Sequence, residues 1–169
     1  MAGHPSARAE AISQFRVEKS HARATLTLSN GTSVPGCFFI SGNSRTHTGP
    51  EGIKDVLNGE TGFFPFERPD GRQTILYNRD HVVFVALADK EEPRRDPGYH
   101  VAKRRVVAIL MSNGTRLHGA VRVFRPEGRD RLSDFTKTDE RFQYLETEHA
   151  TYIINVRHIV ELTEESTVP

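Results

Sequence analysis

The sequence predicts a mostly β protein made of two tandem five-stranded modules, each bent strongly into a small barrel. The first reason is an internal repeat: residues 28–36 (LSNGTSVPG) return as residues 111–119 (MSNGTRLHG). Further matched positions follow in the same order along the chain, which is typical of a duplicated structural unit. The second reason is that apolar and polar residues alternate on both sides of each Asn-Gly pair, as in strands joined by hairpins.

The first module is predicted to span residues 20–88. Residues 24–28 alternate between apolar residues and threonine, which indicates a strand. Asn30-Gly31 is expected to supply the positive φ angles of a tight turn. The returning strand covers residues 34–40 and contains Gly36 on its apolar face, where the missing side chain permits sharp bending or close backbone approach.

The second module, residues 99–162, repeats this order and places Gly119 where the first has Gly36. Each hairpin is followed by an Asp-containing segment, an aromatic strand and a closing two-stranded hairpin. The aromatic strands are residues 63–66 and 142–145, and the closing hairpins are residues 74–85 and 151–162. Outside the modules, we expect a tail or short helix over 1–19, a charged linker over 89–98 and a tail over 163–169.

Composition bounds the class of protein. No apolar run of the 169-residue chain approaches the roughly 20 residues of a membrane span. Residues 1–16 lack the apolar stretch of a signal peptide, and a single cysteine, Cys37, excludes an intramolecular disulfide framework. We therefore expect a cytoplasmic protein without membrane contact. The first module is neutral, with six basic and six acidic residues, whereas the second has eleven basic and eight acidic residues, an excess of three positive charges.

No set of residues with catalytic, cofactor-binding or metal-binding spacing is present, so we expect no enzyme, no cofactor and no metal. One cysteine cannot form a CxxC motif, and no HExxH motif occurs. The matched pairs Asp55/Asp134 and Glu67/Glu146 recur in both copies, which favours a structural role such as capping of a turn by aspartate. The matched His81 and His158 are expected to cap hairpins.

The strand order, the Asn-Gly hairpin and the glycine in the bent second strand resemble the Sm-like fold, which includes Sm and LSm proteins and bacterial Hfq. Residues 26–36 and 109–119 resemble the first motif of that family, and residues 75–83 and 153–160 resemble the second. The repeats look closest to uncharacterised bacterial tandem Sm-like domains, for which the resemblance implies no activity. The resemblance to the Sm-like fold covers most of both copies of the repeat.

Two functions follow from this resemblance, because Sm-like proteins mostly assemble into rings and bind RNA. The first is a non-catalytic interaction or assembly module with a protein partner or a second copy, since exposed strand edges favour such association. The alternative is single-stranded RNA binding, for which Asp55–Asn58 matches a family loop element. The candidate RNA- or anion-binding residues are Asp55, Asn58, Arg79, Arg125, Arg129, Arg131 and Arg157.

Stacking on aromatic rings beside basic residues would support RNA binding. Most aromatic residues lie on apolar strand patterns and are expected in the core, namely Phe38, Phe63, Phe66, Phe142 and Tyr144. Tyr77 and Phe135 flank polar turns and are the two candidates for stacking.

Overall fold

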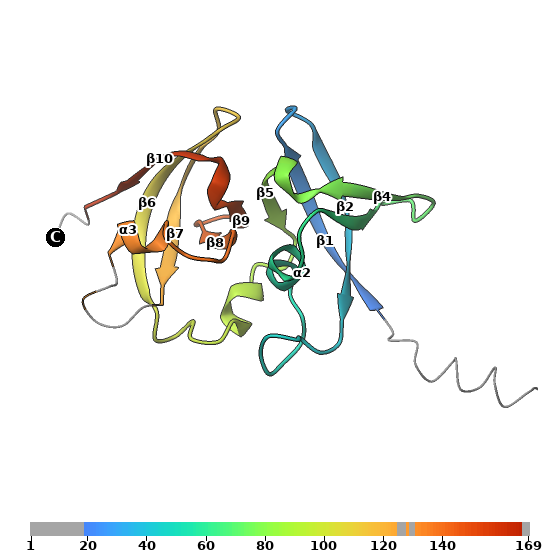
Figure 1. Ribbon diagram of the computed structural model, residues 1–169, viewed down its shortest axis with the longest axis horizontal. Coiled ribbons are helices and arrows are strands. Elements are labelled where there is room, and N and C mark those ends of the chain that lie inside the picture. The colour runs from blue at the N-terminus through green and yellow to red at the C-terminus, as the bar shows by residue number, and fades with distance from the viewer. Residues whose placement is uncertain (1–18, 125–127, 129–130, 167–169) are drawn as a thin grey trace, which may run out of the picture.

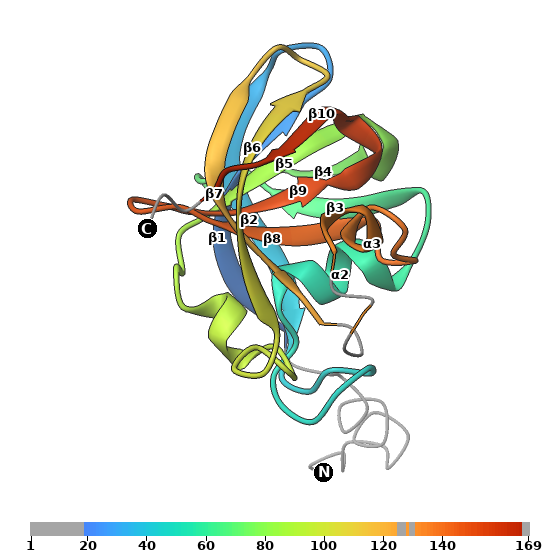
Figure 2. The ribbon, with the colours of Figure 1, turned by 90° about the vertical axis from the view of Figure 1, so that its left-hand side faces the viewer.

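The computed structural model describes residues 19–124, 128 and 131–166, so the predicted N-terminal tail or helix lies almost entirely outside the described residues. The described strands form one continuous antiparallel sheet with the order β10-β6-β7-β8-β9-β5-β1-β2-β3-β4 (Figures 1 and 2). The first half contains β1 (Lys19–Leu28), β2 (Ser33–Ser41), α2 (Ile53–Gly59), β3 (Phe63–Glu67), β4 (Thr74–Asn78), η1 (Arg79–His81) and β5 (Val82–Leu87). After η2 (Glu92–Arg95), the second contains β6 (Lys103–Met111), β7 (Arg116–Val123), α3 (Leu132–Phe135), β8 (Phe142–Glu146), β9 (Thr151–Asn155), η3 (Val156–His158) and β10 (Ile159–Glu164).

The mostly β class predicted from the sequence is confirmed, and the repeat is visible in the strand order. The first half runs β5-β1-β2-β3-β4 across the sheet, and the second runs β10-β6-β7-β8-β9. The two halves are joined because β5 pairs with β9. No strand pairing in the described part of the chain closes either half into a barrel. The two separate barrels expected from the sequence are thus not seen as closed sheets, since β5 takes its second partner from the other half.

Both Asn-Gly pairs form the predicted hairpin turns, but asparagine and glycine have different roles in them. Gly31 and Gly114 have φ angles of 86° and 85°, and no described residue other than glycine has a positive φ. The Asn30 side-chain oxygen instead accepts a hydrogen bond from the backbone N–H of Thr32 at 3.0 Å, and Asn113 does the same for Thr115. The expectation of positive φ at both residues is therefore wrong for the asparagines.

Gly36 and Gly119 mark the predicted points of close backbone approach. A Cβ atom on Gly36 would lie 2.3 Å from the carbonyl oxygen of Glu67, and one on Gly119 would lie 2.6 Å from that of Glu146. Next to these glycines β2 pairs with β3 at only two positions, and β7 pairs with β8 at one. The sheet bends sharply there, because the missing side chain lets the backbone of β3 pass close to β2 and that of β8 pass close to β7.

Two hydrophobic cores lie in the molecule, and each contains side chains from both halves. The first core, built mainly on β1, β2, β3 and α2, also buries Phe142 and Ile153. The second core, built mainly on β6 and β7, also buries Val83 and Phe84. Each core is therefore completed by apolar side chains from the other half, next to the pairing of β5 with β9.

The burial of the aromatic residues agrees only in part with the prediction. Phe38, Phe66 and Phe142 are buried as expected, and Tyr144 packs against the first core. Phe63, which was expected in the core, is 60% exposed. The two stacking candidates are not surface platforms: Phe135 is buried, and Tyr77 packs against the first core.

The predicted linker and C-terminal tail are both more ordered than expected. Residues 89–98 contain η2, in which Glu92 is buried. Strand β10 continues to Glu164, so residues 163 and 164 belong to the sheet, and the Glu165 N–H still donates to the Val106 carbonyl at 2.9 Å. None of the helices in the described ranges is long and apolar enough to cross a lipid bilayer.

Candidate functional site

The joint between the halves is a strand pairing flanked by polar side chains from both. In its register Phe84 faces Ile154 and Leu87 faces Thr151. Asn155, fully buried at the end of β9, donates from Nδ2 to the Val82 carbonyl at 2.8 Å. Its Oδ1 accepts from the backbone N–H of Arg157 at 3.1 Å. One side chain therefore satisfies main-chain groups on both sides of the joint.

Two further contacts lock the halves together. Asn58 on α2 makes a two-way hydrogen bond with the backbone of Phe142, donating to its carbonyl and accepting from its N–H at 2.9 Å each. Arg141 forms an ion pair of 2.6 Å with Asp80 and donates to the Arg79 carbonyl at 3.2 Å. The hydrogen bond from Arg141 and its charge hold the pKa of Asp80 below its ordinary value.

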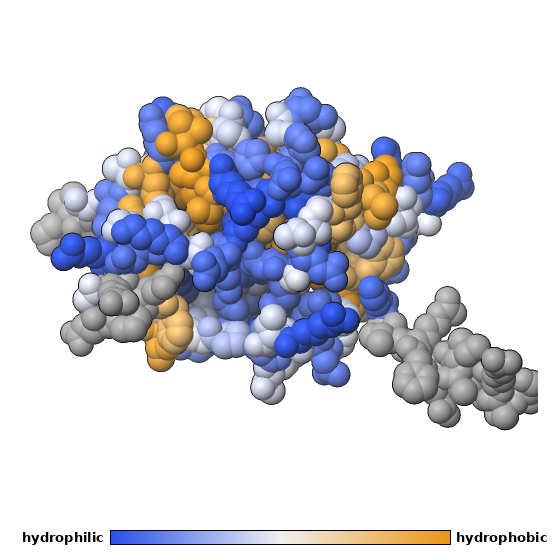
Figure 3. Space-filling model, in the orientation of Figure 1, coloured by the Kyte–Doolittle hydropathy of each residue, from blue (hydrophilic) through white to orange (hydrophobic). Residues whose placement is uncertain are grey.

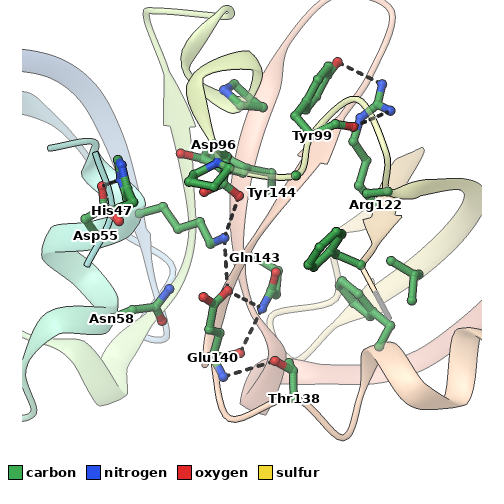
Figure 4. Close-up of a pocket in the computed structure, with 18 of the residues that line it drawn as sticks. His47, Asp55, Asn58, Asp96, Tyr99, Arg122, Thr138, Glu140, Gln143 and Tyr144 are labelled. Atoms are coloured by element: carbon green, nitrogen blue, oxygen red, sulfur yellow. Dashed lines mark hydrogen bonds and ion pairs between the residues drawn. The ribbon is translucent and has the colours of Figure 1, made fainter. Parts of the chain in front are cut away.

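Lys54 is the central polar residue of a network next to this joint, and Figure 4 shows its two acidic partners, Asp96 and Glu140. It is 7% exposed, and its Nζ lies 3.1 Å from Asp96 and 3.0 Å from Glu140. Burial opposes the charged ammonium, but the two carboxylates outweigh it and raise the pKa of Lys54. Glu92 accepts hydrogen bonds from the Tyr144 hydroxyl at 2.8 Å and from the Lys54 backbone N–H at 3.2 Å. Residues of the predicted linker therefore tie α2 to β8.

Burial changes the proton affinity of two groups in this network. It raises the pKa of Glu92, although the hydrogen bonds from Lys54 and Tyr144 act in the opposite direction. Burial, together with the neighbouring Glu92, also raises the pKa of Tyr144. Tyr144 thus remains a hydrogen-bond donor, which is the role it has toward Glu92.

A cavity of about 790 Å³ lies between the two halves (Figure 4), and Lys54 is one of the residues that line it. On its far wall Arg122 stacks on Tyr99, with the guanidinium carbon 3.7 Å from the ring centroid. Arg122 also forms an ion pair of 3.0 Å with Glu146, which accepts from the Tyr99 hydroxyl at 2.7 Å. The cavity is lined by six carboxylates, at Asp55, Asp96, Asp134, Asp139, Glu140 and Glu146.

The charges of the cavity oppose binding of an anion. Among the described lining residues the lysine and arginine side chains are Lys54 and Arg122, and both are already paired with carboxylates. A phosphate group would meet more negative than available positive charge. These charges do not favour an RNA backbone in the cavity, and the ion pair of Lys54 with Glu140 links α2 to the second half of the chain.

Aspartates and histidines matched by the repeat have the structural roles predicted for them. Asp55 accepts from the N–H of Gly52 at 2.8 Å, and Asp134 accepts from that of Arg131 at 3.1 Å, so each caps a short helix. His81 Nδ1 lies 2.8 Å from the hydroxyl of Ser29, and His158 Nδ1 lies 2.6 Å from that of Ser112. Each histidine ties its turn to the first hairpin of the same half.

His47 makes the stability of the loop that precedes α2 depend on pH. Its Nε2 lies 2.9 Å from Asp55, and this hydrogen bond raises the pKa of His47 above its ordinary value. A histidine with a raised pKa contributes stability that is fully present below the ordinary pKa of about 6.5 and is lost as the pH rises through the raised value. We expect His47→Asn to lower the free energy of unfolding more at about pH 5.5 than at about pH 8.5, as measured by urea denaturation.

The control for this substitution is His149→Asn, because the His149 side chain is 87% exposed. This variant is expected to change the unfolding free energy little at either pH. An equal loss for His47→Asn at both pH values would show that the protonated imidazole contributes nothing to the loop.

The structure does not gather the RNA-binding candidates into one surface. Asp55 and Asn58 are engaged in the contacts described above. Arg79 is 3% exposed and donates to the carbonyls of Val56, Leu57 and Phe63 at 3.0, 3.1 and 2.7 Å, so it is a core residue. Arg131 and Arg157 are exposed, on different elements of the second half, and Arg125 and Arg129 lie outside the described residues.

One sequence signal could have identified Arg79 as buried. The repeat places an apolar residue, Val156, at the same position of the second copy. Valine is more typical of an interior site than of an anion-binding surface, although Val156 itself is only half-buried.

The sequence indicated that strand edges are exposed but did not show which residues form the edges at the two ends of the sheet. Strand β4 forms one end and β10 the other (Figure 1). Near β4 the side chains of Phe63, Pro65 and Leu76 are exposed, and on β10 Val160 is exposed. Apolar side chains show on both sides of the face in Figure 3, with hydrophilic ones between them.

The repeat relates each of these exposed residues to one that is covered at the joint. Phe63 and Leu76 are 60% and 64% exposed, whereas their counterparts Phe142 and Ile153 are both 0% exposed. Val160 is 62% exposed, whereas its counterpart Val83 is 0% exposed. Pro65 corresponds to Tyr144, which packs against the first core. What covers these positions inside the molecule is the other half.

The described residues contain no cluster of three potential metal ligands. Comparisons with models of protein families, with curated proteins and with solved structures found no match for this chain.

Proposed function

We propose that this protein is a non-catalytic tandem Sm-like assembly module that joins copies of itself by extending its sheet at β4 and β10. The observation that carries the proposal is the contrast in burial between positions matched by the repeat. At the internal joint the edge of the sheet formed by β5 covers the apolar surface around β9. The same kind of surface around β4 is uncovered. Strand β10, which corresponds to β5 in the second half, pairs with β6 on one side and with no described strand on the other.

The internal joint also supplies the register of the proposed contact. Phe84 faces Ile154 and Leu87 faces Thr151 inside the molecule. When each of these residues is replaced by its match in the other copy of the repeat, Glu161 of one molecule faces Tyr77 of the next and Glu164 faces Thr74. Such a contact places main-chain N–H and C=O groups of both edges in one antiparallel ladder.

The contact is head-to-tail, because each copy offers two different edges. The hairpins β1–β2 and β6–β7 point the same way in both views, so the halves repeat along the long axis (Figures 1 and 2). Contacts of this kind generate a ring when the rotation between copies closes and an open filament when it does not. The resemblance to Sm-like proteins, which mostly assemble into rings, supports the same function.

Burial of the exposed apolar side chains stabilises the contact to a moderate degree. Fully burying a leucine or phenylalanine contributes about 1.5–3 kcal/mol. Association costs at least about 4 kcal/mol in lost translational and rotational freedom. A few side chains therefore leave a small surplus, and we expect association that depends on protein concentration.

Leu76→Asp is the direct test of the proposed contact. The wild-type protein is expected to show a mass above the 19.0 kDa of one chain that grows with concentration, in sedimentation velocity and in sizing chromatography with light scattering. Leu76→Asp places a charge at the centre of the β4 edge and is expected to give a single 19.0 kDa species with an unchanged circular dichroism spectrum.

Val101→Asp is the matched control, because Val101 is exposed and lies outside both edges. It should associate like the wild type. A wild-type protein that stays at the mass of one chain at the highest concentration, or a Leu76→Asp variant that still associates, contradicts the proposed function.

A further inference from the structure

We infer that the contact between copies is specified by charges of opposite polarity to those of the internal joint, with Arg157 and Lys137 of one copy facing Glu60 of the next. This inference rests on the proposed function and names the residues that select the partner. The partner is a second copy of this chain.

The internal joint has its acidic group on the first half and its basic group on the second. Asp80, just before β5, forms the 2.6 Å ion pair with Arg141, just before β8. The repeat replaces Asp80 by Arg157 and Arg141 by Gly62. The turn that precedes β10 therefore carries a positive charge where the turn that precedes β5 carries a negative one. The Arg157 charge also acts on Asp80 of its own chain, where it adds to the effect of Arg141 in lowering the pKa of Asp80.

Glu60 supplies the complementary charge on the β4 side. It stands two residues before Gly62, at the end of α2, and is exposed. The carbonyl of the next residue, Thr61, accepts from Nη1 of Arg79 at 3.5 Å, and Arg79 directly follows β4, so Glu60 lies next to this edge. No hydrogen bond or ion pair of the Glu60 side chain is formed within the described residues. An arginine side chain is several bonds longer than an aspartate side chain, so Arg157 can span the two-residue offset.

Lys137 adds a second positive charge to the same side of the contact. It occupies the position of Asn58, which both donates to and accepts from the backbone of Phe142. A lysine ammonium has donors only, so Lys137 cannot reproduce the accepting half of this contact. The repeat places Lys137 beside Phe63 of the next copy, three residues from Glu60, and its side chain is exposed.

The reversed polarity selects the correct edge as well as the partner. If β10 paired with β9 in place of β5, Arg157 would face Arg141, and like charges there would oppose the pairing. Facing Glu60, the same arginine is attracted. The internal joint and the contact between copies thus use the same strand geometry but cannot exchange their partners.

Charge reversal in two separate chains tests the inference. Arg157→Glu and Glu60→Arg are each expected to weaken self-association roughly three- to tenfold, because like charges then meet at every contact. An equimolar mixture of the two variants is expected to associate as strongly as the wild type, since every mixed contact again joins opposite charges. The readout is sedimentation velocity of each variant alone and of the mixture, with one variant fluorescently labelled, at low and high salt.

Arg94→Glu, which reverses an exposed arginine outside both edges, is the control and should associate like the wild type. If the wild type associates and Leu76→Asp abolishes this, but the charge variants associate normally or their mixture does not recover, the inference is overturned and the proposed function stands. If the wild type does not associate at all, both the inference and the proposed function are contradicted. At high salt the difference in association between each variant alone and the mixture should shrink, because screening weakens both the repulsion and the attraction.

Discussion

Asn155→Leu is expected to lower the free energy of unfolding by about 3–4 kcal/mol, since buried polar groups left without partners cost about 1–3 kcal/mol each. Asn155 is fully buried and bonds the Val82 carbonyl and the Arg157 N–H. It also accepts from Arg141 at 3.3 Å. Leucine has a similar size but leaves all three groups without this partner at the joint. Urea denaturation followed by circular dichroism measures the loss.

The repeat offers a matched control for this substitution. Asn78 occupies the same position at the end of β4 but is only half-buried, and its side chain accepts a single hydrogen bond, from the Asp80 N–H at 2.9 Å. Asn78→Leu should cost about 1 kcal/mol, which is typical of a lost cap. Equal losses for the two variants would show that the internal joint contributes no more to stability than an ordinary turn.

Arg79→Met is expected to lower the free energy of unfolding by about 2–4 kcal/mol, because its guanidinium satisfies carbonyls that have few other donors. Two of them, Val56 and Leu57, belong to the last turns of α2, and the third is Phe63 at the start of β3. Methionine keeps much of the packing volume and removes all the donors. Arg79→Lys should give an intermediate loss, since a single ammonium cannot reach three carbonyls in the fork geometry of arginine.

Arg157→Met is the control, because Arg157 lies in the corresponding turn of the second half and is exposed. At a protein concentration too low for association, it should change the unfolding free energy by less than about 0.5 kcal/mol. A comparable loss for the two arginines would contradict the assignment of Arg79 to the core. It would also reopen Arg79 as a surface residue available to RNA.

Local patterns in the sequence were enough to predict the strands but not the short helices. Alternation and the Asn-Gly pairs place the hairpins correctly, since both depend on residues close together in the chain. Helix α2 was missed although Ile53 and Leu57 stand four residues apart and Asp55 caps its first turn. Seven residues between loops rich in glycine and serine form too short a periodic pattern to be recognised.

The candidate site could be predicted only in part, because its residues depend on contacts far apart in the chain. The capping roles of Asp55 and Asp134 are local and were predicted. The burial of Arg79 depends on carbonyls 16 to 23 residues away, and that of Glu92 on Tyr144, 52 residues away. Neither separation leaves a pattern in the neighbouring sequence.

The sequence by itself determined that one five-strand order occurs twice and that a glycine stands where each sheet bends. Only the tertiary structure decided that β5 of the first half pairs with β9 of the second, joining both into one sheet. The physical reason is that a strand edge offers the same row of N–H and C=O groups whatever its side chains are. Which edges meet is settled by side chains such as Asn155, Asn58 and Arg141, whose partners lie in the other half.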